Sequence, residues 1–125
     1  MPLKTNLHLH TADDPLDNLS YSFFQMIDRA KSLNFDVLAL TCHKKFIWKK
    51  EYFDYAFQNN ILLISGIEGR IGDKDVIILN CGKEAENLKT FNDLARYKKE
   101  NPRIFVLAPH PFVLTGKSLK EKLEE

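Results

Sequence analysis

The sequence predicts an α/β fold built on a mainly parallel β-sheet. Runs of consecutive apolar residues, typical of strands buried on both faces, occur at 36–41, 61–64 and 104–107. Segments with apolar residues at helical spacing separate these runs. The chain of 125 residues is long enough for one domain and no more. Strands alternating with helices in one short domain indicate an α/β fold.

The first third of the chain predicts a strand, a loop and a helix. Residues 7–10 alternate apolar and polar side chains, as a short strand does. Residues 11–19 are dense in Asp, Asn and Pro and are expected to form a loop. Apolar residues recur at helical spacing over 20–33, where Ser20 can cap the start of the helix and Asn34 can end it.

The rest of the chain repeats this alternation around the apolar runs. A helix is expected at 49–59, and the strand at 76–79 follows a turn that favours a hairpin with the strand before it. A further helix is expected at 84–99, and a short charged helix at 118–125.

Composition excludes several classes of protein. Lys plus Arg number 18 and Asp plus Glu 17, so the net charge of +1 supplies no global attraction to nucleic acid or to an acidic membrane. No apolar stretch approaches the roughly 18 residues of a membrane span, and no secretory signal is expected. The isolated Cys42 and Cys81 form neither a disulfide framework nor a zinc motif. A cytoplasmic protein is therefore expected.

Metal-binding side chains fall near the ends of the predicted strands. His8 and His10 are two residues apart, so they share one face of a strand. His43, Glu68 and His110 each follow a later strand, on the rim where parallel α/β folds assemble their sites. This distribution predicts a shared metal site, although each histidine taken alone could be a structural residue near a loop.

The ligand types restrict the metal. Imidazole and carboxylate ligands suit zinc, manganese or iron. Strand alternation directs Cys42 away from His43, so this thiol is expected to pack in the core. The two oxygens of Glu68 could bridge two ions.

Four segments in order resemble the motifs of the PHP (polymerase and histidinol phosphatase) family. They are Leu7-His8-Leu9-His10-Thr11, the run 36–43 ending in Cys42-His43, Gly66-Ile67-Glu68 and Ala108-Pro109-His110-Pro111. The resemblance covers 7–112. It implies a distorted, seven-stranded β/α barrel, two or three metal ions and metal-dependent hydrolysis of phosphoesters.

The resemblance also implies roles for the candidate ligands. His8 and His10 would bind a first ion, Glu68 would bridge it to a second, and His110 would bind the second. His43 would bind a third ion together with a carboxylate from the loop 11–19.

Some positions depart from the family pattern, and the loop ligand could be any of three aspartates. Asp14 is the expected loop ligand, with Asp13 and Asp17 as close alternatives. Asp75 stands where the family usually has a histidine, so it is either a ligand or a simple turn aspartate, and Cys42 replaces a common Asp.

The closing part of the family pattern is missing. Nothing after Phe112 resembles the family's last ligand motif. We therefore expect a single PHP-like domain over 1–125, a partial barrel that lacks the C-terminal strands. A barrel cannot close on so few strands, and open edges favour pairing. A homo-oligomer, or a missing C-terminal part, is expected to cover them.

Two functions from different classes follow. The first is a metal-dependent phosphoesterase acting on a phosphate-containing substrate, with Glu68 and Arg70 as candidate catalytic residues because arginine binds phosphate in a bidentate manner. The alternative is a weak or inactive metal-binding module that acts through self-association or a partner. The segment 44–50, with four lysines, Phe46 and Trp48, could grip phosphate or stack a base, or could be a solvated helix start. Nucleic-acid binding is possible but not expected as the primary role.

Overall fold

A five-stranded sheet, curled into half of a barrel, forms the centre of the protein. The computed structural model describes residues 1–113 and 116–119. The strands are β1 (Thr5–Leu9), β2 (Val37–Leu40), β3 (Leu62–Ile71), β4 (Lys74–Leu79) and β5 (Phe105–Leu107). The helices of this part of the chain are α1 (Phe23–Ser32), α2 (Lys50–Gln58), the 3₁₀ helix η1 (Lys83–Asn87) and α3 (Phe91–Glu100). The expected mixture of helices and strands is confirmed, and the curled sheet is compatible with a partial barrel. The sheet is not mainly parallel as expected, because two of its four strand pairings are antiparallel.

The strands lie in the sheet in their sequence order. β1, β2 and β3 run parallel to one another, while β4 is antiparallel to both β3 and β5. The expected hairpin is therefore confirmed. Its two-residue turn is Gly72-Asp73, and both residues have positive φ angles of 50° and 64°, as a type I′ turn requires. This turn sets Arg70 opposite Asp75.

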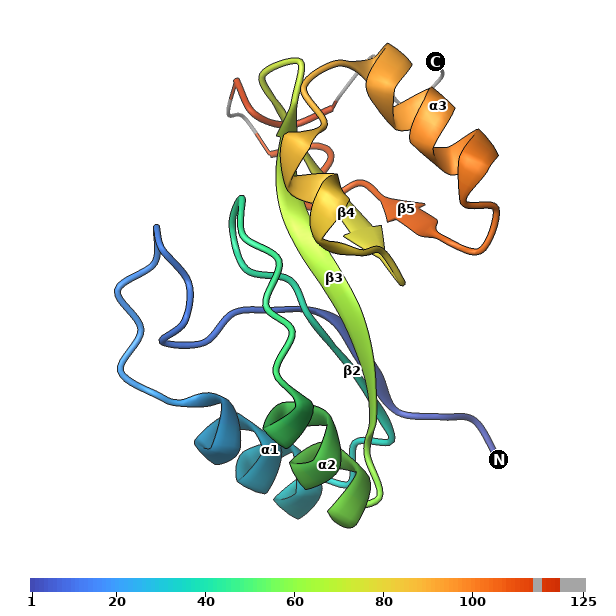
Figure 1. The fold of residues 1–125 in the computed structure, drawn as a ribbon. Helices are drawn as coiled ribbons and strands as arrows, with labels where there is room; N and C mark the ends of the chain where they lie inside the picture. The colour runs from blue at the N-terminus through green and yellow to red at the C-terminus, as the bar shows by residue number, and fades with distance from the viewer. Residues whose placement is uncertain (114–115, 120–125) are drawn as a thin grey trace.

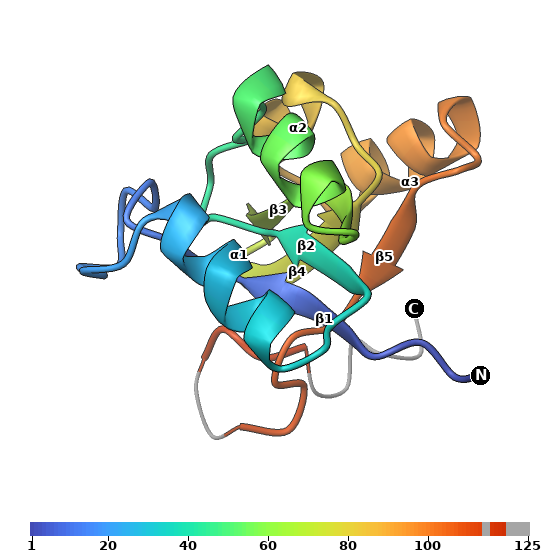
Figure 2. The ribbon, with the colours of Figure 1, turned by 90° about the horizontal axis from the view of Figure 1, so that it is seen from below.

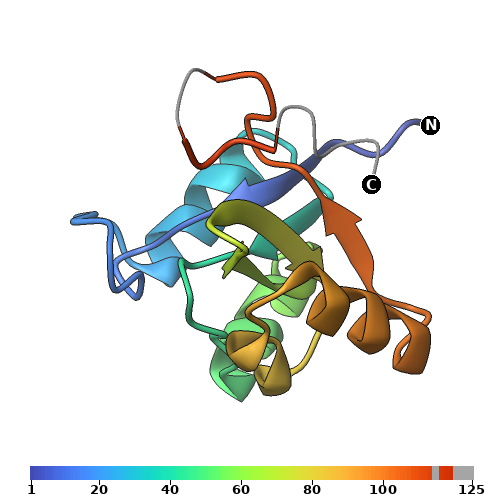
Figure 3. The same cartoon turned by 90° about the horizontal axis from the view of Figure 1, so that it is seen from above.

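Two hydrophobic cores lie at opposite ends of the long strand β3 (Figure 1). The first packs α1 and α2 against β2 and the start of β3, around Phe23, Ile27 and Leu38. The second packs α3 and η1 against the β3–β4 hairpin, around Ile67 and Ile78. Seen from either end of β3, the curled sheet carries these helices on its outer side (Figures 2 and 3).

Helix α1 begins later than the sequence pattern indicated. Ser22, not Ser20, is the N-cap, and it forms a capping box with Gln25. The box satisfies two backbone N–H groups that the helix would otherwise leave free, which fixes the start at this point. The end agrees with the expectation, because Asn34 follows the helix with a left-handed φ of 57°.

The single helix expected at 84–99 is wrong. The structure has η1 and α3 separated by the segment 88–90, because Thr90 caps a new helix through a capping box with Asp93. The strand expected at 61–64 is also longer than predicted, so Glu68 lies inside β3 rather than after it. The expected helix at 118–125 falls mostly outside the described residues, and Ser118 and Leu119 are not helical.

Within the described part of the chain, no helix has the length and apolar character needed to cross a membrane.

Candidate metal centre

His8 in β1 and His10 just after the end of β1 reach the same site. The register between β1 and β2 shifts between Asn6 and Leu9. Thr41 stabilises the shifted end, because its hydroxyl accepts from the Leu9 N–H at 3.1 Å and its own N–H donates to the Leu9 carbonyl at 2.8 Å. His8 and His10 consequently flank Leu9 on the opposite face of the strand, and their ring centroids are 4.9 Å apart.

Glu68 is the hub of the site. Its residue surface is only 2% exposed, yet all four histidines of the chain approach its carboxylate. The Nε2 atoms of His8, His10 and His43 lie 2.9, 3.1 and 3.3 Å from Oε2. His110 Nε2 lies 3.6 Å from Oε1. Side chains from segments far apart in the sequence thus converge on one buried carboxylate.

The backbone around Glu68 fixes this position. Its N–H donates to the Cys42 carbonyl at 3.2 Å, and its own carbonyl accepts from the Lys44 N–H at 2.8 Å. These bonds extend the pairing of β2 with β3 by an isolated parallel bridge between His43 and Glu68. The bridge holds His43 beside the hub even though it lies beyond the end of β2.

Asp14 is the loop carboxylate that enters the site. Its side chain is fully buried, and Oδ2 lies 2.7 Å from His10 Nδ1 and 3.1 Å from His43 Nδ1. The N–H of His43 donates to Oδ2, and those of Leu16 and Asp17 donate to Oδ1. The carboxylate is held from several directions before any ligand arrives.

The other two loop aspartates are placed differently. An Asp17 oxygen is 3.8 Å from His10 Nδ1 and 3.7 Å from His43 Nδ1, so it borders the site. Asp13 faces away and accepts hydrogen bonds from Lys49 at 2.8 Å and from the Tyr52 hydroxyl at 2.7 Å. The sequence pattern did not predict this anchor between the loop and the start of α2.

The ionisable groups of the site are strongly perturbed. Burial works against a charge on His10, but hydrogen bonds from Glu68 and Asp14 raise its pKa to about 8. Burial likewise opposes the charge on Asp14, and hydrogen bonds from His10 and from backbone N–H groups nevertheless lower its pKa to about 2. For Glu68, hydrogen bonds and charge from the histidines overcome burial and hold its pKa well below the usual range. Without metal, a proton on His10 offsets part of the negative charge of the two carboxylates.

Three groups of side chains in the described residues could hold a metal ion, because one ligand atom from each member lies within 4.8 Å of the others. The groups are His10, Asp14, Asp17 and His43; His8, His10 and Glu68; and Glu68, Asp75 and His110. Nitrogen and carboxylate donors at such distances suit a divalent transition ion, so the donor set fits the implied metal. His10 and Glu68 each belong to two groups, so neighbouring ions would share ligands.

Arg70 and Asp75 form a cross-strand ion pair rather than two independent site residues. Arg70 Nη2 lies 2.8 Å from Asp75 Oδ1, and both side chains are largely buried. The Arg70 Nε atom is buried and has no hydrogen-bond partner among the described residues. Asp75 therefore already has a cation, while Arg70 retains a donor.

Cys42 packs in the first core, as the strand alternation predicted. It is fully buried and free. Burial raises the pKa of its thiol to about 11, so the thiolate that a metal would need is disfavoured.

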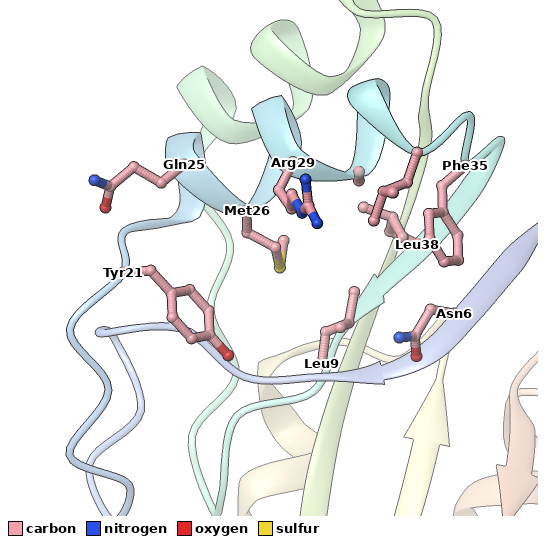
Figure 4. Close-up of a pocket in the computed structure, with 10 residues that line it drawn as sticks. Asn6, Leu9, Tyr21, Gln25, Met26, Arg29, Phe35 and Leu38 are labelled. Carbon is pink, nitrogen blue, oxygen red and sulfur yellow. The ribbon is translucent and has the colours of Figure 1, made fainter.

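A separate apolar pocket of about 490 Å³ lies between α1 and the edge of β1 (Figure 4). Met26, Leu9 and Leu38 point into it, and none of the candidate metal ligands lines it. It lies on the face of β1 opposite the histidines and does not belong to the metal centre.

No family model matches the sequence, and no curated protein matches it. The chemistry of the site consequently rests on the geometry of its own side chains.

Proposed function

We propose that this protein is a metal-dependent phosphoesterase of the PHP kind, in which metal-activated water hydrolyses a phosphate ester. The observation that carries the proposal is the convergence of four histidines on the buried Glu68, with Asp14 beside them. A site with overlapping ligand groups favours two or three neighbouring ions, the arrangement suited to phosphoryl chemistry. Its two free, buried thiols fit a reducing compartment such as the cytoplasm.

Zinc, manganese or iron bound there would lower the pKa of a water molecule and neutralise charge on the phosphate. The chain's own residues hold and orient these components. His8, His10 and Glu68 would hold one ion, and Asp14 with His43 would hold a neighbouring one. Glu68 remains a carboxylate, so its oxygens could donate lone pairs to a metal ion and accept a hydrogen bond from water.

Arg70 supports the proposal as a phosphate ligand only indirectly. Its Nη2 is engaged by Asp75, so the guanidinium cannot present both Nη atoms to a phosphate without losing that ion pair. Its Nε has no hydrogen-bond partner among the described residues, but this atom is buried and is not presented at the surface. We propose a secondary role for Arg70 and a primary role for the ligands around Glu68.

The test is metal content together with turnover. The purified protein is analysed for bound zinc, manganese and iron, stripped with a chelator, and assayed on p-nitrophenyl phosphate as each metal is restored. We expect bound metal, a rise in melting temperature on its return, and hydrolysis that depends on it. Absence of both binding and thermal stabilisation would refute the metal centre itself.

A second candidate function is a metal-binding module that acts through self-association. The observation favouring it is the half-open sheet, since among the described strands β1 and β5 each pair on one side only. Phe105 on β5 is 60% exposed, which leaves apolar surface at that edge. Sedimentation at several concentrations tests it: a dimer that binds metal without hydrolysing esters supports the module, and a monomer counts against it.

A further inference from the structure

A hollow of about 650 Å³ is lined in part by residues that directly follow two of the candidate metal ligands along the chain. Its wall begins at Pro15, directly after Asp14, and continues at Lys44, directly after His43. The remaining lining residues are Lys45, Phe46, Trp48, Lys83 and Glu86. A ligand with one end at the metal centre could therefore extend into this hollow.

The hollow carries an excess of positive charge. Lys44, Lys45 and Lys83 are exposed, and none of them forms an ion pair with another described residue. Glu86 is the one acidic residue in the lining, and one of its oxygens already accepts the Phe46 N–H at 2.8 Å. Three lysine ammonium groups without protein partners favour an anionic ligand.

The basic surface continues beyond this hollow. A second hollow of about 380 Å³ shares Lys44 and Glu86 with the first and adds Arg70 and Lys89. Arg70 is engaged by Asp75, so Lys44 and Lys89 are the cations of this hollow that form no ion pair with another described residue. Room for more than one anionic group thus lies along this surface.

An exposed aromatic ring completes the hollow. Trp48 is 57% exposed, although burying an indole would be favourable. Its ring is nevertheless fixed, because it packs on Phe53 with centroids 3.7 Å apart and runs nearly parallel to Phe46 at 6.3 Å. A rigid, exposed indole beside lysines is the arrangement that stacks a nucleobase while cations hold its phosphate.

We propose that this hollow binds the nucleotide part of the substrate, with the base on Trp48 and a phosphate that does not react on Lys45 and Lys83. The inference rests on the proposed function, because it assigns the substrate class of the same site. Nucleotides meet both demands of the hollow, a flat ring and more than one negative charge. A simple sugar phosphate lacks the ring, and a nucleoside lacks the charge.

The single tryptophan of the chain makes binding directly visible. Metal-stripped protein is titrated with ADP, ribose 5-phosphate or adenosine while Trp48 fluorescence is followed. We expect saturable quenching by ADP, and a dissociation constant roughly tenfold or more lower than for either partial ligand, as loss of base stacking or charge implies. Equal affinity for ADP and ribose 5-phosphate, or no saturable quenching, would overturn the proposal.

Variants locate the site. Lys45→Ala and Lys83→Ala should each weaken ADP binding several-fold and reduce its dependence on salt. Lys99→Ala removes the same charge from the exposed side of α3, far along the chain from the hollow, and should change nothing. Calorimetry with Trp48→Leu should show about tenfold weaker ADP binding. If the three lysine variants behave alike, the hollow is not the binding site.

The two proposals can fail separately. Quenching by ADP without any hydrolysis would leave nucleotide binding standing and refute the phosphoesterase. Metal-dependent hydrolysis of p-nitrophenyl phosphate without saturable ADP binding would have the opposite meaning.

Discussion

Two sides of the metal centre differ in how completely the protein prepares them. On the Asp14 side, the carboxylate is fully buried, accepts from three backbone N–H groups and contacts two imidazoles at about 3 Å. On the Asp75 side, the carboxylate is paired with Arg70, and the His110 side chain is 37% exposed. His110 also sits in a loop with a positive φ of 34°. One side is preorganised and the other must rearrange.

This difference predicts that the two sides of the centre bind metal ions with different affinities. A site whose ligands are already held loses little conformational entropy when an ion binds. A site that must break an ion pair and order a loop binds more weakly. We expect a tight ion on the side of His10 and Asp14, and a weak, exchangeable ion on the side of Asp75 and His110.

The largest effect is expected from Glu68, which both sides share. Glu68→Gln removes a ligand on the Asp75 side and the carboxylate charge that contacts His10 and His43 on the Asp14 side, so metal affinity should fall roughly 100-fold or more on both sides and activity should be lost. Metal titration by calorimetry measures this. Glu51→Gln on the exposed start of α2 is the matched control. Retention of one tight ion in Glu68→Gln would show that the two sides are independent.

The comparison between the sides is tested most directly by paired histidine variants. His10→Asn should lower the affinity of the protein for the tight ion about 100-fold, because His10 belongs to two ligand groups. The tight ion should then be lost on dialysis. His110→Asn should leave the tight ion bound and lower the affinity of the weak one about tenfold. Stoichiometry by elemental analysis after dialysis separates them. Equal losses in the two variants would contradict an unequal centre.

The pH dependence should have opposite sign with and without metal. The pKa of His10 is raised to about 8, so the stability that its proton provides is present below its ordinary value of 6.5 and is lost as pH rises through 8. The melting temperature of metal-free protein should therefore fall from pH 6.5 to 8.5. The free energy of unfolding should fall by up to about 2 kcal/mol over the same range. Metal binding displaces the same proton, so affinity should rise roughly tenfold from pH 7 to 8.

The matched control for this prediction is His10→Asn, which should flatten the pH dependence of the metal-free melting temperature. Asp14 affects stability at acidic pH. Its pKa is lowered to about 2, so its contribution to the free energy of unfolding is present above pH 3.8 and is lost as pH falls through 2. A metal-free protein most stable above pH 8 would contradict the charge arrangement described here.

The smallest effect is expected from Arg70. Arg70→Met frees Asp75 from its ion pair, so the weak side should bind metal several-fold more tightly while the metal-free protein loses about 3 kcal/mol. Denaturant unfolding and metal titration are both needed. Arg70→Lys, which keeps the charge, is the control and should lie between the two proteins. Unchanged affinity in Arg70→Met would mean that Asp75 is not a ligand on either side.

Much of the fold follows from local patterns in the sequence. The apolar runs predicted β2, β3 and β5, and the Gly72-Asp73 turn predicted the hairpin. The missed break in the helix expected at 84–99 has a local cause, since Thr90 and Asp93 form a capping box that the apolar spacing concealed. The capping box at Thr90 therefore decides where α3 begins, although the spacing of the apolar residues continues through this point.

The site was less accessible to sequence reasoning. The residue types and their order placed His8, His10, His43, Glu68 and His110 near one rim, and the structure brings them together. The engagement of Asp75 by Arg70 depends on cross-strand register, and the turn that sets it had been used only to predict the hairpin. The anchor from Asp13 to Lys49 and Tyr52 joins segments far apart in the chain, and no local signal reveals it.

The length of β3 has a consequence for how the protein opens. Its ten residues begin in one core and end in the other, and Glu68 lies where the two meet. Each core can act as its own cooperative unit, as contiguous packed regions do in native-state exchange. His8, His10 and His43 belong to the first unit, whereas Asp75 and His110 belong to the second. An ion bound across Glu68 would fasten the units together, so that amide protons in α1 and in α3 would exchange as one.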